Sequence, residues 1–512
     1  MRKLALALIL LAACSRSSNH QAPEFGGAGI AYVAEPMRAD RALMQSPEIE
    51  HNTEEYGRIE ENAFLRPADN PLSTFSIDVD RASYANVRRF LREGTRPPRD
   101  AVRIEEMVNY FTYEYAEPVS GDPVSVTTEL AACPWNGQNR LLLVGLQTKK
   151  IDTRDLPPNN LVFLVDTSGS MMASNKLPLV KSALRLLVDQ MRDEDRVSIV
   201  AYAGSAGLVL KPTKGSDRAA ILEAIEAFEA GGSTAGAEGI VLAYDIAKEN
   251  FLRDGNNRVI LATDGDFNVG VTSEGELEQL IEEKRRDGIF LTVLGFGSGN
   301  LKDSKMELLA DKGNGNYAYI DTIAEARKSL VREMGATLFT VAKDVKVQVE
   351  LNPATVGAYR LIGYENRLLR AEDFNNDAKD AGELGAGHSV TALYEIVPPG
   401  GEVPNASVDA LKYQSRTTAA GGAELATVKI RYKEPQGDTS KLMTHVVSAA
   451  TELVPSENFR LASSVAQLGL LLRDSPHKGN ATFASIPRID AEDFAEVVAM
   501  AREAETPKNA GL

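Results

Sequence analysis

The sequence Leu161-Val-Phe-Leu-Val-Asp-Thr-Ser-Gly-Ser170 joins an apolar strand to a polar turn. The run of leucine, valine and phenylalanine before Asp166 is typical of a parallel strand that is covered on both faces. Asp166, Ser168 and Ser170 then follow at every second position. In an extended segment this alternation places three oxygen-bearing side chains on one side. We therefore expect a cradle for a hard divalent cation where the strand ends.

Strands and helices alternate around this stretch. Strands are predicted at 160–165, 196–203, 258–263, 289–295 and 316–320, with a short edge strand near Gly207–Leu210. Helices are predicted at about 176–192, 217–229, 237–252, 274–287 and 323–337. This order is typical of an α/β doubly wound, Rossmann-like fold, in which helices cover both faces of a parallel sheet. Such a sheet binds ligands beyond the carboxyl ends of its strands.

A second carboxylate, Asp264, follows the predicted strand 258–263. Carboxylates at neighbouring strand ends face one point, and Thr234 in the loop Gly231-Gly232-Ser233-Thr234 would add a hydroxyl there. The two glycines let this loop approach closely. Three hydroxyls and two carboxylates suit Mg²⁺, which prefers oxygen ligands in octahedral geometry and retains water. Mn²⁺ and Ca²⁺ are the alternatives.

This set of residues resembles the metal-ion-dependent adhesion site (MIDAS) of von Willebrand factor A (VWA) domains. Asp166, Ser168 and Ser170 match the DxSxS motif, Thr234 the loop threonine and Asp264 the distal aspartate. The resemblance covers roughly residues 160–337. It implies a non-enzymatic domain that binds another protein, with the ion bridging to an acidic group of that partner. It does not identify the partner.

The flanking sequence narrows the resemblance to bacterial VWA lipoproteins. Asn70–Asp80 and Val102–Phe111 look like the N-terminal extension of that subgroup. Asp264–Gly270 and Gly382–Tyr394 also look like its sequences, and the subgroup carries an additional C-terminal domain.

Strand patterns lie on both sides of the α/β region, at 124–131 and 140–148 before it and at 345–350, 389–397 and 426–432 after it. We therefore predict that the VWA domain is inserted in a mostly-β, sandwich-like domain with flanking helices. The predicted segments are an N-terminal extension at 71–158, the VWA domain at 159–338, a C-terminal β domain at 339–455 and a helical segment at 456–512.

The N-terminus reads as an export signal. Arg2 and Lys3 precede the short apolar run Leu4–Leu11, and Leu11-Ala-Ala-Cys14 resembles a bacterial lipobox. We expect a signal peptide at 1–13, lipidation of Cys14 and a flexible tether at 14–70. Ser15 in place of an aspartate favours the outer membrane of the bacterial cell envelope.

Charge and cysteine content bound the remaining possibilities. A formal net charge of −16 disfavours nucleic acid as a partner, because phosphate binding needs clustered lysine and arginine. With Cys14 lipidated, the second of the two cysteines, Cys133, has no partner for a disulfide and is predicted to be a buried thiol.

Alternatives remain for two segments of the sequence and for the function of the protein. Asp78 and Asp80 share one side of a strand-like segment and either bind an ion or cap the following helix, with the structural role favoured. Gly295-Phe-Gly-Ser-Gly299 is rich in glycine but lacks the ending of a phosphate-binding loop, so we expect a turn beside the ion site. The alternative functions are a structural envelope protein with a stabilising metal site, and a metal-assisted hydrolase with Asp266 as base.

Overall fold

The computed structural model describes residues 52–119, 121–151, 156–233, 236–265, 274–333, 339–404, 422–435, 437–452 and 454–505. Cys14 and the predicted signal peptide lie outside these ranges. No helix within them is long and apolar enough to cross a membrane.

The α/β domain is built on a six-stranded sheet in the order β6-β5-β4-β7-β8-β9. All neighbouring strands are parallel except β5 and β6, which are antiparallel. The strands are β4 (Asn159–Asp166), β5 (Arg196–Tyr202), β6 (Ala206–Lys214), β7 (Asn256–Thr263), β8 (Ile289–Phe296) and β9 (Tyr317–Ile320). The doubly wound prediction is confirmed, and β4 and β7 lie side by side, so that their carboxyl ends meet at one edge.

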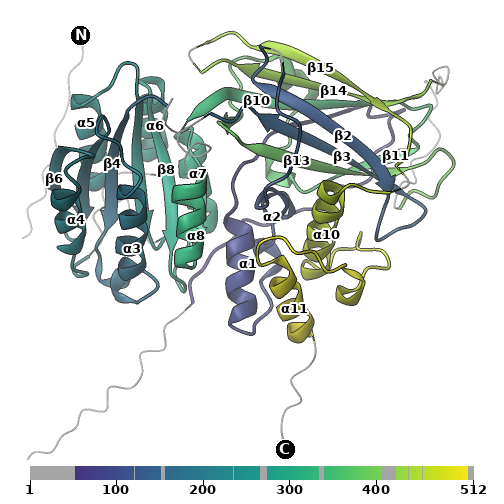
Figure 1. The fold of residues 1–512 in the computed structure, drawn as a ribbon. Coiled ribbons are helices and arrows are strands. Elements are labelled where there is room, and N and C mark those ends of the chain that lie inside the picture. The colour runs from purple at the N-terminus through teal and green to yellow at the C-terminus, as the bar shows by residue number, and fades with distance from the viewer. Residues whose placement is uncertain are drawn as a thin grey trace, which may run out of the picture. The chain divides into compact units, whose positions relative to one another are not determined.

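Helices cover both faces of this sheet (Figure 1). One face packs against α3 (Leu177–Val188), α4 (Arg218–Glu226) and α8 (Ile323–Arg327), which continues as a π-helical turn over Lys328–Arg332. The other face packs against α5 (Gly236–Glu249), α6 (Glu274–Arg286) and α7 (Asp303–Lys312). Successive residues of β4 contribute alternately to the two cores, which explains why every position of this strand is buried.

The second domain is a sandwich of two antiparallel sheets around one apolar core. The first sheet has the order β1-β10-β14-β15, with β12 also pairing with β10, and the second has the order β11-β13-β3-β2. The strands are β1 (Leu72–Ser76), β2 (Val124–Ala132), β3 (Arg140–Thr148), β10 (Thr340–Leu351), β11 (Ala358–Ile362), β12 (Gly382–Gly385), β13 (Ser389–Val397), β14 (Glu424–Lys433) and β15 (Lys441–Ser448).

Strand pairing confirms that the α/β domain is inserted in the sandwich. β3 precedes that domain in the chain, yet it pairs with β13, which follows it, with Gln147 opposite Ser389. β1 likewise pairs with β10, with Leu72 opposite Glu350. Figure 1 shows the early strands β2 and β3, in blue, beside the green β13.

A helical layer covers the outer face of the second sheet. It contains α1 (Ala82–Arg92), α2 (Ile104–Asn109), α10 (Glu457–Leu472) and α11 (Phe494–Glu505), together with short 3₁₀ turns at Arg99–Ala101 and Phe483–Ser485. Leu141 and Leu143 of β3 belong to this second core, whereas Leu142 faces the interior of the sandwich. The sheet is therefore buried on both faces, and Cys133 lies in the helical core as a buried thiol, as predicted.

The structure departs from the sequence-based expectations at two places. Residues 52–70 are not a loose tether, because Glu55 N donates to the carbonyl of Leu301, and Leu65 exchanges backbone hydrogen bonds with Tyr359. Helix α7 was not predicted, since its sequence is mostly polar. The N-cap of α1 is Arg81, and the Ser83 amide donates to Glu106 Oε2 over 2.8 Å.

Candidate functional site

Asp166 is the last residue of β4 and is fully buried. Its Oδ1 accepts a hydrogen bond from the Ser168 amide at 2.9 Å, which closes the turn after the strand. Its Oδ2 accepts from the Tyr202 hydroxyl at 3.2 Å and from Thr263 Oγ1 at 3.1 Å. The two neighbouring strands, β5 and β7, thus hold this carboxylate in place.

The two serines of the motif lie together above this carboxylate. Ser168 Oγ and Ser170 Oγ are 3.1 Å apart, at the start of a 3₁₀ turn over Gly169–Met172. Ser168 is buried, whereas Ser170 is exposed. The motif therefore leads from the buried strand end to the solvent.

The glycine loop after α4 lies against the same turn. Gly231 N donates to the Thr167 carbonyl at 2.8 Å, and Gly169 N donates to the Gly232 carbonyl at 3.0 Å. Gly232 has φ +82°, and a Cβ atom there would lie 3.2 Å from the backbone nitrogen of Gly204. The close approach expected of this loop is confirmed as far as Ser233. Thr234 lies outside the described residues.

Asp264 follows β7 and is also fully buried. Its Oδ2 lies 3.0 Å from the ammonium of Lys176, which also donates to Asn300 Oδ1 at 3.0 Å. Burial alone would raise the pKa of Asp264, but the hydrogen bonds from Asn300 and Ser170 and the charge of Lys176 lower it below its usual value. Asp264 therefore remains ionised near neutral pH.

The electrostatics of the site favour a cation. Burial raises the pKa of Asp166 to about 6, hydrogen bonds from Ser168 oppose this shift, and the negative charge of Asp264 adds to it. The structure thus joins Asp166, Ser168, Ser170 and Asp264, here called the ion site. Two desolvated carboxylates with hydroxyls beside them match the oxygen ligands that Mg²⁺ and Mn²⁺ prefer, so the residues present fit a divalent ion.

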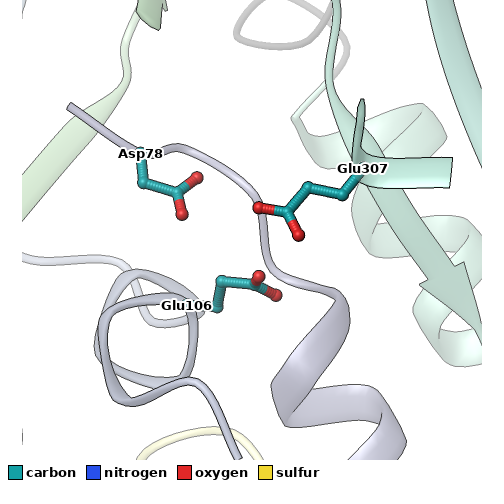
Figure 2. A group of neighbouring side chains, drawn as sticks. All are labelled: Asp78, Glu106 and Glu307. Carbon is teal, nitrogen blue, oxygen red and sulfur yellow. The ribbon is translucent and has the colours of Figure 1, made fainter. Parts of the chain in front are cut away.

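The structure brings Asp78 together with two carboxylates that the sequence did not link to it. Asp78, Glu106 and Glu307, here called the junction cluster, each offer one oxygen within 4.8 Å of the others. Figure 2 shows their carboxylates turned toward one another, from the segment after β1, from α2 and from α7. All three residues are buried.

Two arginines already neutralise much of this cluster. Arg103 contacts Glu106, lies 3.3 Å from Glu307 Oε2 and pairs with Asp303 at 2.6 Å. Arg367 Nη2 lies 3.0 Å from Glu307 Oε1 and 3.1 Å from Asp80 Oδ2, and Nε lies 3.4 Å from Asp78 Oδ2. Asp78 and Asp80 therefore join an ion-pair network and do not cap α1.

The glycine-rich stretch at 295–299 forms the end of β8 and the turn after it, and this turn lies beside the ion site, as predicted. Gly297 has φ +75° and Gly299 has φ +94°, and the next residue, Asn300, contacts Lys176. Lys176 itself was not predicted, because a lysine after a turn gives no signal that distinguishes it from a surface residue.

Comparison with known proteins agrees with the fold. Residues 160–333 match the model of the von Willebrand factor type A domain, residues 50–143 match a model described as von Willebrand factor, and residues 336–503 match the model "Uncharacterized protein YfbK, C-terminal". The protein YfbK of Escherichia coli K12 is 45% identical over 447 residues, covering 85% of this chain and 76% of that protein. The chain belongs to the YfbK family. It therefore contains a VWA domain, a family whose members typically bind a divalent metal at the MIDAS and are mostly non-enzymatic.

Other relatives and solved structures cover a smaller share of the chain. The protein sll0103 of Synechocystis is 31% identical over 190 residues, 36% of this chain and 43% of that protein. Among solved structures, a von Willebrand factor type A protein from Catenulispora acidiphila is 18% identical over 69% of this chain and 80% of that chain, with a TM-score of 0.38.

Proposed function

We propose that this protein is a divalent-metal-dependent protein-binding module of the bacterial cell envelope. The observation that carries the proposal is the ion site, where two fully buried carboxylates and two serine hydroxyls gather at the edge formed by β4 and β7. Asp166, Ser168, Ser170 and Asp264 would hold Mg²⁺, which supplies a positive centre for an acidic group of a partner protein. Exposed Ser170 marks the side from which a partner reaches the ion.

The placement of the histidines favours binding over hydrolysis. A metal-assisted hydrolase needs a general base close to the ion. His388, His445 and His477, the histidines in the described part of the chain, lie before β13, on β15 and after α10, away from the ion site. Asp266, the base considered from the sequence, lies outside the described residues.

The lipobox-like sequence supports attachment to the membrane. Leu11-Ala-Ala-Cys14 would be cut before Cys14 and lipidated there, which would anchor the protein without a membrane-spanning helix. We propose the outer membrane as its site.

The experiment that tests this function is capture of partners from envelope membranes with the full-length lipoprotein, in Mg²⁺ and in EDTA. Binding should require Mg²⁺ and should be lost in Asp166→Ala, while circular dichroism shows a retained fold. Glu249→Gln is the matched control. Glu249 is exposed and is the last residue of α5, and the connection after α5 leads to the start of β7, whereas the ion site lies at the carboxyl end of β7. Capture of the same proteins at full strength in EDTA and by Asp166→Ala would contradict the proposal.

A further inference from the structure

Lys176 brings a fixed positive charge to the ion site. Its Nζ lies 3.0 Å from Asp264 Oδ2 and 3.0 Å from Asn300 Oδ1. The lysine side chain is 10% exposed and Asp264 is fully buried, so water screens this pair little. Lys176 is none of the residues in the MIDAS pattern, yet it contacts the distal carboxylate directly.

The fold guides the lysine to this position. Its aliphatic stem crosses Gly297, where a Cβ atom would lie 2.4 Å from Lys176 Cγ and 2.5 Å from Cε. Gly297 also has φ +75°, a conformation that residues with side chains rarely adopt. A side chain at position 297 would therefore displace the lysine, and the glycine leaves a channel that fixes where the ammonium lies.

Given the proposed function, we propose that Lys176 is a positioning residue of the ion site that acts as a built-in counter-ion of Asp264. It holds Oδ2 of that carboxylate and stabilises the metal-free site, where two buried carboxylates would otherwise repel each other. The same ammonium repels a divalent ion and takes up part of the negative charge of Asp264. The lysine thus lowers the affinity of the site for the ion and leaves a bound ion more positive toward an acidic partner.

The test compares Lys176→Gln and Lys176→Met with the wild-type protein by calorimetric titration of MgCl₂ and MnCl₂. Removing a buried unit charge that contacts a carboxylate of the ion site should tighten binding by at least about tenfold. Lys181→Gln is the control, because Lys181 lies on α3, which begins immediately after Lys176, but donates to the backbone carbonyl of Glu226 at the surface. Its affinity for Mg²⁺ should equal that of the wild-type protein.

Thermal unfolding gives a second readout that needs no partner. Without metal, Lys176→Gln should unfold at a lower temperature than the wild-type protein, and saturating Mg²⁺ should raise its unfolding temperature by more than it raises that of the wild type. Lys176→Arg retains the charge and should keep the weaker, wild-type affinity. If Lys176→Met does not fold, Lys176→Gln still tests the loss of the positive charge by itself, because the glutamine amide can keep a hydrogen bond to Asp264.

The outcomes separate the two proposals. Equal Mg²⁺ affinity in the wild type and Lys176→Gln would overturn the role of Lys176 and leave the metal site intact. Absence of binding in both proteins would overturn the metal site and the role of Lys176 together. Binding of Mg²⁺ to Lys176→Gln but not to the wild-type protein would support the role of Lys176. It would also mean that the wild-type site works with the lysine ammonium in place of a metal ion.

Discussion

The ion site and the junction cluster both bury carboxylates, but they differ in the cations beside them. At the ion site, Asp166 and Asp264 face two hydroxyls and one ammonium, and Ser170 is exposed. In the junction cluster, two arginines contact all three carboxylates. The ion site has one built-in cation, Lys176, for two carboxylates and opens to solvent at Ser170, whereas the two arginines of the junction cluster contact all three of its carboxylates. The difference separates a site that binds from a contact that holds the chain together.

The largest effect is expected from Arg103→Met. Arg103 is 5% exposed, and its loss leaves Glu106, Asp303 and Glu307 without their shared cation. Removing one partner from a buried ion pair costs about 3–5 kcal/mol, which urea unfolding should detect. Arg58→Met is the control, because the Arg58 side chain is 82% exposed and its pair with Glu60 contributes little. Equal stability of the two variants would show that the junction cluster holds nothing together.

Measurements of Mg²⁺ binding should distinguish the ion site from the junction cluster. Asp166→Asn should weaken Mg²⁺ binding at least about 100-fold, because loss of even an indirect ligand costs 10–100-fold. Glu307→Gln, in the junction cluster, should bind Mg²⁺ within about twofold of the wild type, since arginines already occupy that site. Calorimetry on both variants measures this contrast. The reverse result, with binding lost only in Glu307→Gln, would move the ion to the junction cluster.

The pH dependence of stability should reveal Glu105, next to the junction cluster. Burial, followed by the charge of Glu365, raises the pKa of Glu105 to about 7 from 4.5, against the opposing charge of Arg473. The folded protein therefore binds more protons than the unfolded chain between these values, and its stability falls as pH rises. Between pH 5 and pH 7 this group accounts for a loss of about 2 kcal/mol. The wild type should lose that much more stability than Glu105→Gln over the same range, and parallel curves would exclude the effect.

The smallest loss of folding stability is expected from Arg367→Lys. Lysine retains the charge but not the planar fork with which Arg367 reaches Asp78, Asp80 and Glu307. We expect a loss of about 1 kcal/mol, against a severalfold larger loss for Arg367→Met. If the lysine and methionine variants were equally unstable, the geometry of the fork rather than its charge would hold the cluster.

The sequence predicted the fold where local patterns and packing agree. The apolar run of β4 is buried at every position, and strands on both sides of the α/β region did reveal the insertion. Helix α7 was missed because its buried positions, such as Met306 and Leu309, lie among charged residues. Pattern recognition depends on apolar periodicity, which a helix with buried Asp303 and Glu307 does not display.

Site residues were predictable when they shared one motif or, like Asp264, followed a neighbouring strand of the same parallel sheet. Asp166, Ser168 and Ser170 lie within five residues and are brought together by one turn. The junction cluster joins segments that are far apart in sequence, and only the packing of α2 and α7 brings Glu106 to Glu307. The start of α1 depends on the same long-range packing, since Glu106 of α2 accepts a hydrogen bond from the Ser83 amide.

The pairing of β3 with β13 also dictates the order in which the chain can fold. Every strand pair of the α/β domain closes within the inserted segment, so this domain can form as soon as it is synthesised. Gln147 cannot pair until Ser389, about 240 residues later in the chain, has been synthesised. At a synthesis rate of about 5–20 residues per second, this takes roughly 10–50 s. During this interval the β2–β3 hairpin lacks β13 at its edge and lacks β10 and β14, which share the apolar core on its inner face. The nascent chain is therefore most prone to aggregate there, and its slowest folding step is closure of the sandwich around a finished VWA domain.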